Sequence, residues 1–422
     1  MEQTYYPALR ETLYYDVLPN GLKIYVLPRP NYGKQFAFLA VNYGGMHTRI
    51  PTEDGEWVDT PAGIAHYLEH KLFDTEEGSA SRLFATNGAA DNAFTAADMT
   101  GYFFEGTHCF EENLRTLLRF VSEPYFTDET VQKERGIIAQ EIRMSEDDPY
   151  SELYYRALDM LYCGHPVTTR IAGTVESIEE IGKETLYLCH SGFYRPGNMV
   201  LCASGDISPD RVREIAMETL SEQPSTPISW EKPAVPVREG AQVCRWEMPV
   251  SAPIFTLLMK GEEPKDGECL RTRLIAELAC DILFGASSEL FNRLYEDGLI
   301  NDDFGGDYEC ISGAAYLYVS GESDAPEQVR DEILTEAAHL AKEGIAPERW
   351  ARFVRAAYGS MVRRLNSLED TCMELAQSSF DGEDYLSFPA VFQSIEKRDV
   401  EDLLGCWCRG ERTALAIVTP KK

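Results

Sequence analysis

Residues Gly63–His70 read Gly-Ile-Ala-His-Tyr-Leu-Glu-His, and the interpretation of the whole sequence starts from them. If this stretch is helical, His66 and His70 stand one turn apart on one face, with Glu69 beside them. Two imidazoles at that separation can bind one tetrahedral zinc ion. The His-x-x-Glu-His order is the inverted zinc-protease motif, the inverzincin signature. It predicts a catalytic Zn²⁺ site, which needs a third protein ligand and one open position.

A second helix, predicted over residues 128–143, offers candidates for the third ligand. Glu134 and Glu141 lie seven residues apart in it, two turns along one face. One of them could bind the metal while the other orients a histidine. The helix is indicated by apolar residues at helical spacing and by a capping residue at its start: Val131, Ile137, Ile138 and Ile142, and Thr127 or Asp128.

These two motifs, with Asn92-Ala93-Phe94-Thr95 between them, resemble the M16 metallopeptidases, the family of pitrilysin, insulysin and the mitochondrial processing peptidase. The resemblance extends over nearly the whole chain. It implies that Glu141 is the third zinc ligand and that Glu134 supports a ligand as part of the catalytic group. More closely, the chain is similar to a half-length bacterial M16B subgroup of insulinase-like peptidases.

The same resemblance implies a role for Asn92, Ala93, Phe94 and Thr95 in substrate binding. They would form an edge strand whose backbone pairs with an extended peptide. The alternative for Ala93 and Phe94 is an ordinary strand with the phenylalanine in the core.

Length and composition limit the class of protein. A chain of 422 residues is longer than a single hydrophobic core usually serves, so at least two domains are expected. The formal net charge of -31 argues against a nucleic-acid partner; it serves solubility or attracts basic peptides. Eleven scattered cysteines indicate free, mostly buried thiols in a reducing compartment. With no signal peptide and no membrane-spanning run, we expect a cytoplasmic protein without a membrane partner.

The order of predicted elements indicates an internal duplication. Residues 222–239 are rich in proline, serine and charge and form the one clear linker. We therefore expect a catalytic domain at 1–221 and a similar domain at 240–422 without a metal site. The fold class is α+β, like that of M16 and LuxS-type metallohydrolases: two tandem homologous domains, each an antiparallel sheet with helices packed on one face.

The individual elements follow from periodicity and turn residues. A hairpin is predicted at 13–18 and 22–27 with an Asn20-Gly21 turn, and a strand at 36–43. After an acidic loop at 52–59, a strand beginning at 92–95 is expected to continue in 101–105. The remaining predicted strands are at 199–203, 241–248, 254–259 and 314–319. The remaining predicted helices are at 81–87, 110–121, 151–162, 183–191, 271–283, 287–296 and 347–364. One more helix is expected to begin near residue 209, and another, capped by residues 323–327, to end at about residue 341.

One departure from the M16 pattern concerns the second half. Active members have an arginine and a tyrosine there that bind the substrate carbonyl, and the matching positions here hold Tyr295 and Asn301. Arg293 lies two residues earlier, on another helix face, and is a poor substitute. The resemblance implies a clamshell made of two half-length chains. We therefore expect a homodimer, or a heterodimer in which a second M16-like chain supplies the missing pair.

The function that these motifs predict is a zinc-dependent endopeptidase that cleaves peptides or short unfolded polypeptides. Glu69 would act as the general base on zinc-bound water. Two alternatives are a dedicated leader-peptide peptidase for a ribosomally made product and a non-catalytic M16-like scaffold subunit.

Overall fold

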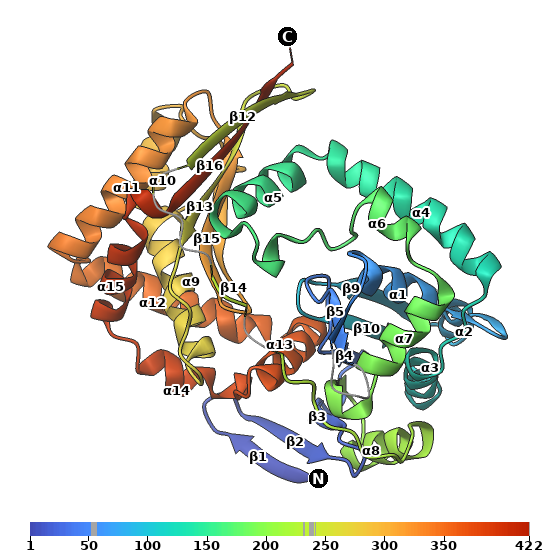
Figure 1. Ribbon diagram of the computed structural model, residues 1–422. Coiled ribbons are helices and arrows are strands. Elements are labelled where there is room, and N and C mark those ends of the chain that lie inside the picture. Colours follow the sequence, from blue (N-terminus) through green and yellow to red (C-terminus); the bar gives the residue numbers. More distant parts are fainter. Residues whose placement is uncertain (52–56, 231–232, 236–239, 241, 422) are drawn as a thin grey trace. The chain divides into compact units, whose positions relative to one another are not determined.

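The computed structural model describes residues 1–51, 57–230, 233–235, 240 and 242–421. The chain forms two compact units, each built around one large sheet (Figure 1). Unit 1 comprises Met1–Ile142, Thr169–Glu231 and Val362–Ser387, and unit 2 comprises Arg143–Thr168, Lys232–Met361 and Phe388–Lys422. No helix among the described residues is both long enough and apolar enough to cross a lipid bilayer.

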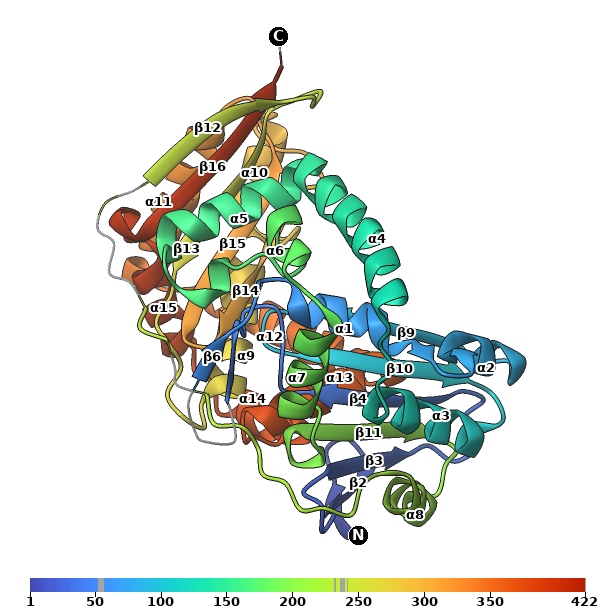
Figure 2. The ribbon, with the colours of Figure 1, turned by 45° about the vertical axis from the view of Figure 1, so that its right-hand side comes forward.

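The sheet of unit 1 has seven strands in the order β1-β2-β3-β11-β4-β10-β9 (Figure 2). Its pairs are antiparallel except for β3 and β11, which run parallel. The predicted Asn20-Gly21 turn joins β2 to β3, with Gly21 in the left-handed region at φ 97°. The strands are β1 (Glu2–Tyr6), β2 (Glu11–Val17), β3 (Lys23–Pro28), β4 (Gln35–Val41), β9 (Ala90–Thr95), β10 (Thr100–Gly106) and β11 (Met199–Gly205).

The strand expected to run from 92 into 105 is instead a hairpin, so this prediction was wrong. β9 and β10 pair antiparallel, with Thr95 opposite Thr100. The turn between them closes with a hydrogen bond from Ala96 N to Met99 O of 2.7 Å. It reads Ala-Ala-Asp-Met and contains no glycine, proline or asparagine, so its sequence carried no strong turn signal.

Both faces of this sheet are covered. In β4, Ala37, Leu39 and Val41 belong to the main core with helices on one face, while Phe36 and Phe38 are buried on the other face. The second face is covered by α13 (Leu368–Phe380), which packs on β4 and β11. Helices that pack into the core of the first face include α1 (Ile64–Leu72), α3 (Phe110–Ser122), α7 (Lys183–Phe193) and α8 (Pro209–Thr219).

The sheet of unit 2 has five strands in the order β12-β16-β13-β15-β14, with β12 and β16 parallel. Helix α5 (Pro149–Tyr162) packs on β13 and β16, and α11 and α15 lie on the opposite face (Figure 1). The bounds are β12 (Gln242–Met248), β13 (Ile254–Lys260), β14 (Gly305–Ile311), β15 (Ala314–Glu322), β16 (Thr413–Pro420), α9 (Cys269–Phe284), α11 (Pro326–Glu343) and α15 (Lys397–Trp407).

The two sheets repeat one plan, which supports the expected duplication. The order β3-β11-β4-β10-β9 in unit 1 matches β12-β16-β13-β15-β14 in unit 2, and the parallel pair occupies the same place in both. The α+β class of two similar sheet-and-helix domains is confirmed. The structure adds that each sheet's second face is covered by a helix from the other half of the sequence, α13 or α5.

The predicted domain ranges 1–221 and 240–422 describe halves of the sequence, whereas each compact unit takes segments from both halves. Of the predicted linker, residues 231–232 and 236–239 lie outside the described residues, as do 52–56 of the acidic loop and residue 241 of the first second-half strand. The described part of the linker contains neither helix nor strand.

Strands β1, β14 and β16 and helices α13 and α15 were not predicted. The remaining elements include the long helices α4 and α12, which were both predicted, and shorter elements, several of which were not. They are β5 (Arg49–Pro51), β6 (Trp57–Asp59), β7 (Asp74–Thr75), β8 (Gly78–Ser79), α2 (Ala80–Thr86), α4 (Asp128–Asp147), α6 (Val175–Glu179), α10 (Glu289–Glu296), α12 (Pro347–Arg364), α14 (Phe388–Gln393) and 3₁₀ turns at Pro166–Thr168, Pro196–Asn198, Tyr385–Ser387 and Gly410–Arg412.

Candidate active site

Helix α1 carries the histidine motif and begins in a tightly packed position. Gly63 precedes it with φ 91°, and a Cβ atom at this glycine would meet the Ala172 carbonyl oxygen at 2.4 Å. Only glycine satisfies both the left-handed backbone and this close approach. The Ser177 hydroxyl donates to Ala62 O at 2.8 Å and ties the same point to α6. The first turn of α1 is therefore fixed against the segment around residue 172.

The apolar residues of α1 face the core of unit 1, where Ile64, Tyr67 and Leu68 are fully buried. His66 and His70 lie on the opposite edge of this buried stripe and are only partly exposed. The spacing of i and i+4 brings their rings to 4.6 Å between centroids. The predicted helical geometry of the motif is thus present.

Helix α4 brings the two glutamates to these histidines. Thr127 caps it, accepting a hydrogen bond from Thr130 N at 3.2 Å. Ile138 and Ile142 are buried as predicted, but Ile137 is 44% exposed and does not belong to the packed stripe. Tyr67 of α1 donates its hydroxyl to Val131 O at 2.6 Å, which joins the two helices directly.

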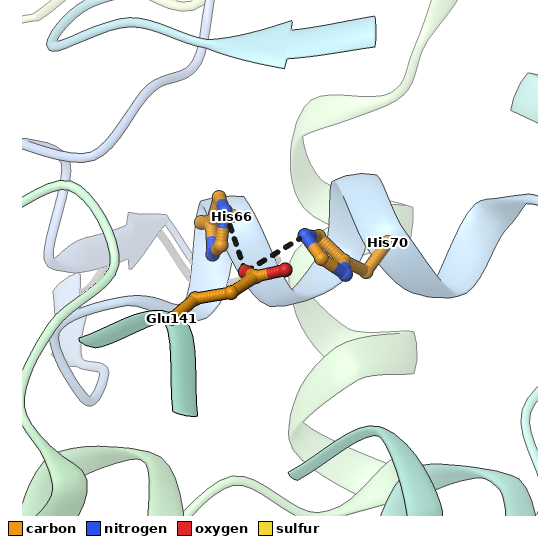
Figure 3. A group of neighbouring side chains, drawn as sticks. All are labelled: His66, His70 and Glu141. Carbon is orange, nitrogen blue, oxygen red and sulfur yellow. Dashed lines mark ion pairs between the residues drawn. The ribbon is translucent and has the colours of Figure 1, made fainter. Parts of the chain in front are cut away.

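The Glu141 carboxylate lies between the two histidines (Figure 3). Its Oε2 is 3.8 Å from His66 Nε2 and 3.4 Å from His70 Nε2. Ligand atoms bound at roughly 2.0–2.1 Å to a tetrahedral ion lie about 3.3 Å apart, so this trio fits zinc with little movement. Within the described chain, these three residues form a group whose ligand atoms all lie within 4.8 Å of one another. The donor set of two imidazoles and one carboxylate is that of a catalytic zinc site.

Glu134 does not join this trio but holds His70 from the other side. Its Oε1 is 3.0 Å from His70 Nδ1. An Nδ1–H that donates to Glu134 leaves the lone pair on Nε2, the nitrogen that faces Glu141. The hydrogen bond to His70 holds the pKa of Glu134 below its usual range. Glu134 is therefore an ionised acceptor that sets the tautomer of His70.

The two histidines differ in their electrostatics. Burial, with a contribution from neighbouring His70, lowers the pKa of His66 to about 4, so its imidazole is neutral at pH 7. For His70, burial lowers the pKa, but the hydrogen bond to Glu134 and the charges of Glu141 and Glu69 raise it more. A neutral imidazole is the form that binds a metal.

Glu69 lies on the same helix face but has a different partner from the other acids. Thr95 Oγ1 donates to Glu69 Oε2 at 2.8 Å. Burial raises the pKa of the Glu69 carboxyl, and the Thr95 hydrogen bond opposes that shift. A carboxylate with a raised pKa next to a metal-ligand trio is suited to accept and return a proton.

The segment Asn92–Thr95 lies in β9, at the edge of the seven-stranded sheet and next to α1. Ala93 packs against the main core, whereas Phe94 stacks with Phe38 on the α13 face at 6.0 Å. Among the described residues β9 has a strand neighbour on one side only, β10. Backbone groups on its outer side could accept an added strand.

Three residues of unit 2 bear on the arginine and tyrosine that the resemblance led us to expect there. Tyr295 lies on α10, is 51% exposed and stacks on Phe291. Asn301 Nδ2 donates to Glu322 at 3.0 Å, and Arg293 forms an ion pair with Glu332 at 3.0 Å.

Two residues near the site were not singled out by sequence reasoning. Tyr67 joins α1 to α4 as described above. Lys71 directly follows the motif, is fully buried and pairs with Asp74, and its charge also lowers the pKa of Glu134. Neither carries a sequence signal, because a tyrosine or lysine inside a helix is usually a core or surface residue.

All eleven cysteines are free thiols, as predicted, but only four of them, Cys189, Cys202, Cys280 and Cys372, are buried.

Comparison with known proteins gives a family match for each half of the chain. The family description "Insulinase (Peptidase family M16)" matches residues 54–174, and "Peptidase M16 inactive domain" matches residues 180–356. The first range contains the histidine motif and both glutamates.

Relatives of similar length support the match. The uncharacterized zinc protease YmfH of Bacillus subtilis (strain 168) is 35% identical over 426 residues, covering 99% of this chain and 98% of the relative. A crystal structure described as an M16-like peptidase from Alicyclobacillus acidocaldarius has a TM-score of 0.90 at 29% identity, covering 99% of this chain and 100% of that one. Pitrilysin shares the fold with a TM-score of 0.78 at 15% identity, and the match spans 46% of its chain. By its motif, its fold and its full-length similarity to a named zinc protease, this chain belongs to the M16 peptidase family.

Proposed function

We propose that this protein is a zinc-dependent endopeptidase that acts on peptides and short unfolded polypeptides. The observation that carries the proposal is the convergence of His66, His70 and Glu141, with Glu69 beside them on the same helix. A structural zinc site would use four protein ligands, whereas a trio with an adjacent basic carboxylate is the pattern of a hydrolase.

In this mechanism each residue of the site has one task. His66, His70 and Glu141 would hold a zinc ion, which would supply Lewis-acid chemistry for the scissile carbonyl and the attacking water. Glu69 takes the proton from that water and passes it to the leaving amine. Glu134 holds His70 through Nδ1, so that Nε2 stays available as a ligand. Tyr67 keeps α4, and with it Glu141, at a constant distance from α1.

We propose that the substrate binds in an extended form along β9. The edge position of Asn92, Ala93 and Phe94 supports this role, because main-chain hydrogen bonds there would bind many sequences with little side-chain selection. Such binding favours unfolded peptides over folded proteins, whose backbone groups are already paired.

A second chain is also part of the proposal. Tyr295 and Asn301 occupy the positions where the M16 pattern has arginine and tyrosine, and Asn301 is engaged with Glu322. We propose that the active form is a dimer with a second M16-like chain that supplies the missing pair.

The test compares the wild type with Glu69→Gln for zinc content by atomic spectroscopy and for cleavage of a quenched fluorescent peptide library. Because glutamine keeps the shape but cannot accept the proton, both proteins should contain about one zinc per chain, and cleavage should fall at least about 1,000-fold in the variant. Glu129→Gln, on the first turn of α4, is a matched control at an exposed position. Zinc-independent cleavage, or equal cleavage by Glu69→Gln, would overturn the proposal.

A further inference from the structure

We propose that Thr95 is a positioning residue for Glu69, an inference that rests on the proposed function of Glu69 as the general base. Thr95 Oγ1 donates to Glu69 Oε2 at 2.8 Å, joining the last residue of β9 to the catalytic helix. Thr95 was predicted to contact the substrate as part of the edge strand. That prediction concerns its backbone, whereas its side-chain hydroxyl donates to Glu69.

The hydrogen bond matters because a glutamate carboxylate is otherwise loosely oriented. The terminal torsion of glutamate has a broad distribution without sharply separated rotamers. The hydrogen bond from Thr95 to Oε2 restricts rotation of the Glu69 carboxylate. The other oxygen, Oε1, then keeps a constant orientation in each catalytic cycle. A general base whose reacting oxygen is held in the productive orientation reacts faster than one whose oxygen rotates freely.

Thr95 is itself held firmly. It is paired across the hairpin with Thr100, and its β-branched side chain limits the rotation of the hydroxyl. The turn that follows is tied to the loop after β4, with Gly45 N donating to Ala96 O at 2.9 Å and Met46 N donating to Ala97 O at 2.8 Å.

Two further contacts fix the same turn. A Cβ atom on Gly44 would meet Met99 N at 2.5 Å, so loop and turn are in direct backbone contact. The Asp98 side chain accepts a hydrogen bond from Gln377 of α13, the helix contributed by the second half of the sequence. The donor to Glu69 is thus anchored from the sheet, from a loop and from α13.

A positioning role and a substrate-binding role for Thr95 have different kinetic consequences. A threonine hydroxyl has one hydrogen, so while it donates to Glu69 it cannot donate to a peptide. Loss of a positioning contact lowers kcat, whereas loss of a substrate contact raises KM.

The experiment measures kcat, KM and zinc content for Thr95→Val, which keeps the shape and removes the hydroxyl, and for Thr95→Ser, which restores it. Thr95→Val should retain zinc, keep KM within about 2-fold and lose about 10- to 100-fold in kcat. Thr95→Ser should recover most of that loss. Thr95→Ala carries the same test if the valine variant does not fold.

Thr100→Val is the matched control, because Thr100 faces Thr95 across the hairpin and donates its hydroxyl to Tyr43 O at 2.8 Å. It should lower the thermal midpoint and leave kcat close to that of the wild type. An unchanged kcat in Thr95→Val, a raised KM with unchanged kcat, or loss of zinc would each overturn the positioning role. A wild-type protein with neither zinc nor cleavage would instead overturn the proposed function on which the inference rests.

Discussion

His70 lies between two carboxylates that do different work. Glu141 faces its Nε2 at 3.4 Å and Glu134 faces its Nδ1 at 3.0 Å. Both glutamates come from one face of α4, two turns apart, so a single helix would supply both the proposed zinc ligand and the group that orients His70. The two acids are therefore expected to differ in what their loss does to zinc affinity.

Substitution of Glu134 separates orientation from ligation. Glu134→Ala should raise the zinc dissociation constant by about 10- to 100-fold, because His70 loses the acceptor that fixes its tautomer and ring. Glu134→Gln should have a smaller effect, since its amide oxygen can still accept from Nδ1–H. Competition titration against a chromophoric zinc chelator measures both constants.

Glu141→Ala is the reference for this series and should weaken binding more than Glu134→Ala, because it removes a ligand. Equal zinc affinity of wild type and Glu134→Ala would contradict the role given to Glu134.

At the scale of elements, each large sheet is covered on one face by a helix from the other half of the sequence, an arrangement that we call the helix exchange. Helix α13 follows α12 late in the chain and covers β4 and β11 of unit 1, while α5 follows α4 and covers β13 and β16 of unit 2. In both cases the helix fills a sheet face with buried apolar residues, Leu375 on α13 and Leu158 on α5 among them. The stability of unit 1, which holds most of the candidate site, thus depends on residues far away in sequence.

Truncation of these two leucines tests the exchange. Leu375→Ala should destabilise unit 1 by about 2–5 kcal/mol through lost burial and a cavity. Amide hydrogen exchange in β4 and β11, measured by mass spectrometry, should be faster in this variant than in the wild type. Leu158→Ala, although only 17 residues after Glu141 in sequence, should speed up exchange in β13 and β16 instead.

The two variants serve as controls for each other, because both remove the same side chain from a helix that covers a sheet. Faster exchange in β13 and β16 on Leu375→Ala would contradict the assignment of α13 to unit 1.

At the scale of the whole molecule, residues of unit 2 bear on the proposed second chain. Tyr295 is exposed and Asn301 is bound to Glu322, so neither replaces an arginine and tyrosine pair in chemistry. The length matches that of YmfH and about half that of pitrilysin. The proposed assembly of two chains rests on the residues at positions 295 and 301.

Mixing experiments test this assembly. The purified chain alone should cleave the peptide library slowly, and addition of an M16-like chain that carries the arginine and tyrosine should raise cleavage about 10-fold or more. Sedimentation velocity should show a complex of the two. Rapid zinc-dependent cleavage by the purified chain alone would contradict the heterodimer.

The sequence by itself determined the features that depend on near neighbours along the chain. The i, i+4 spacing of His66 and His70, the two-turn spacing of Glu134 and Glu141, and the Asn20-Gly21 turn are set by local backbone geometry. Their side chains therefore lie where periodicity places them.

Only the tertiary structure decided which of these elements meet. The turn between β9 and β10, the bond from Thr95 to Glu69 and the contact of Tyr67 with Val131 join residues without a shared periodicity. The exchange of α5 and α13 reflects the need to bury a second face of each sheet, and any amphipathic helix of suitable length could have met that need. Long-range packing determines which helix covers which sheet face. A single stretch of sequence does not predict this pairing, because the free energy of packing depends on both surfaces in contact.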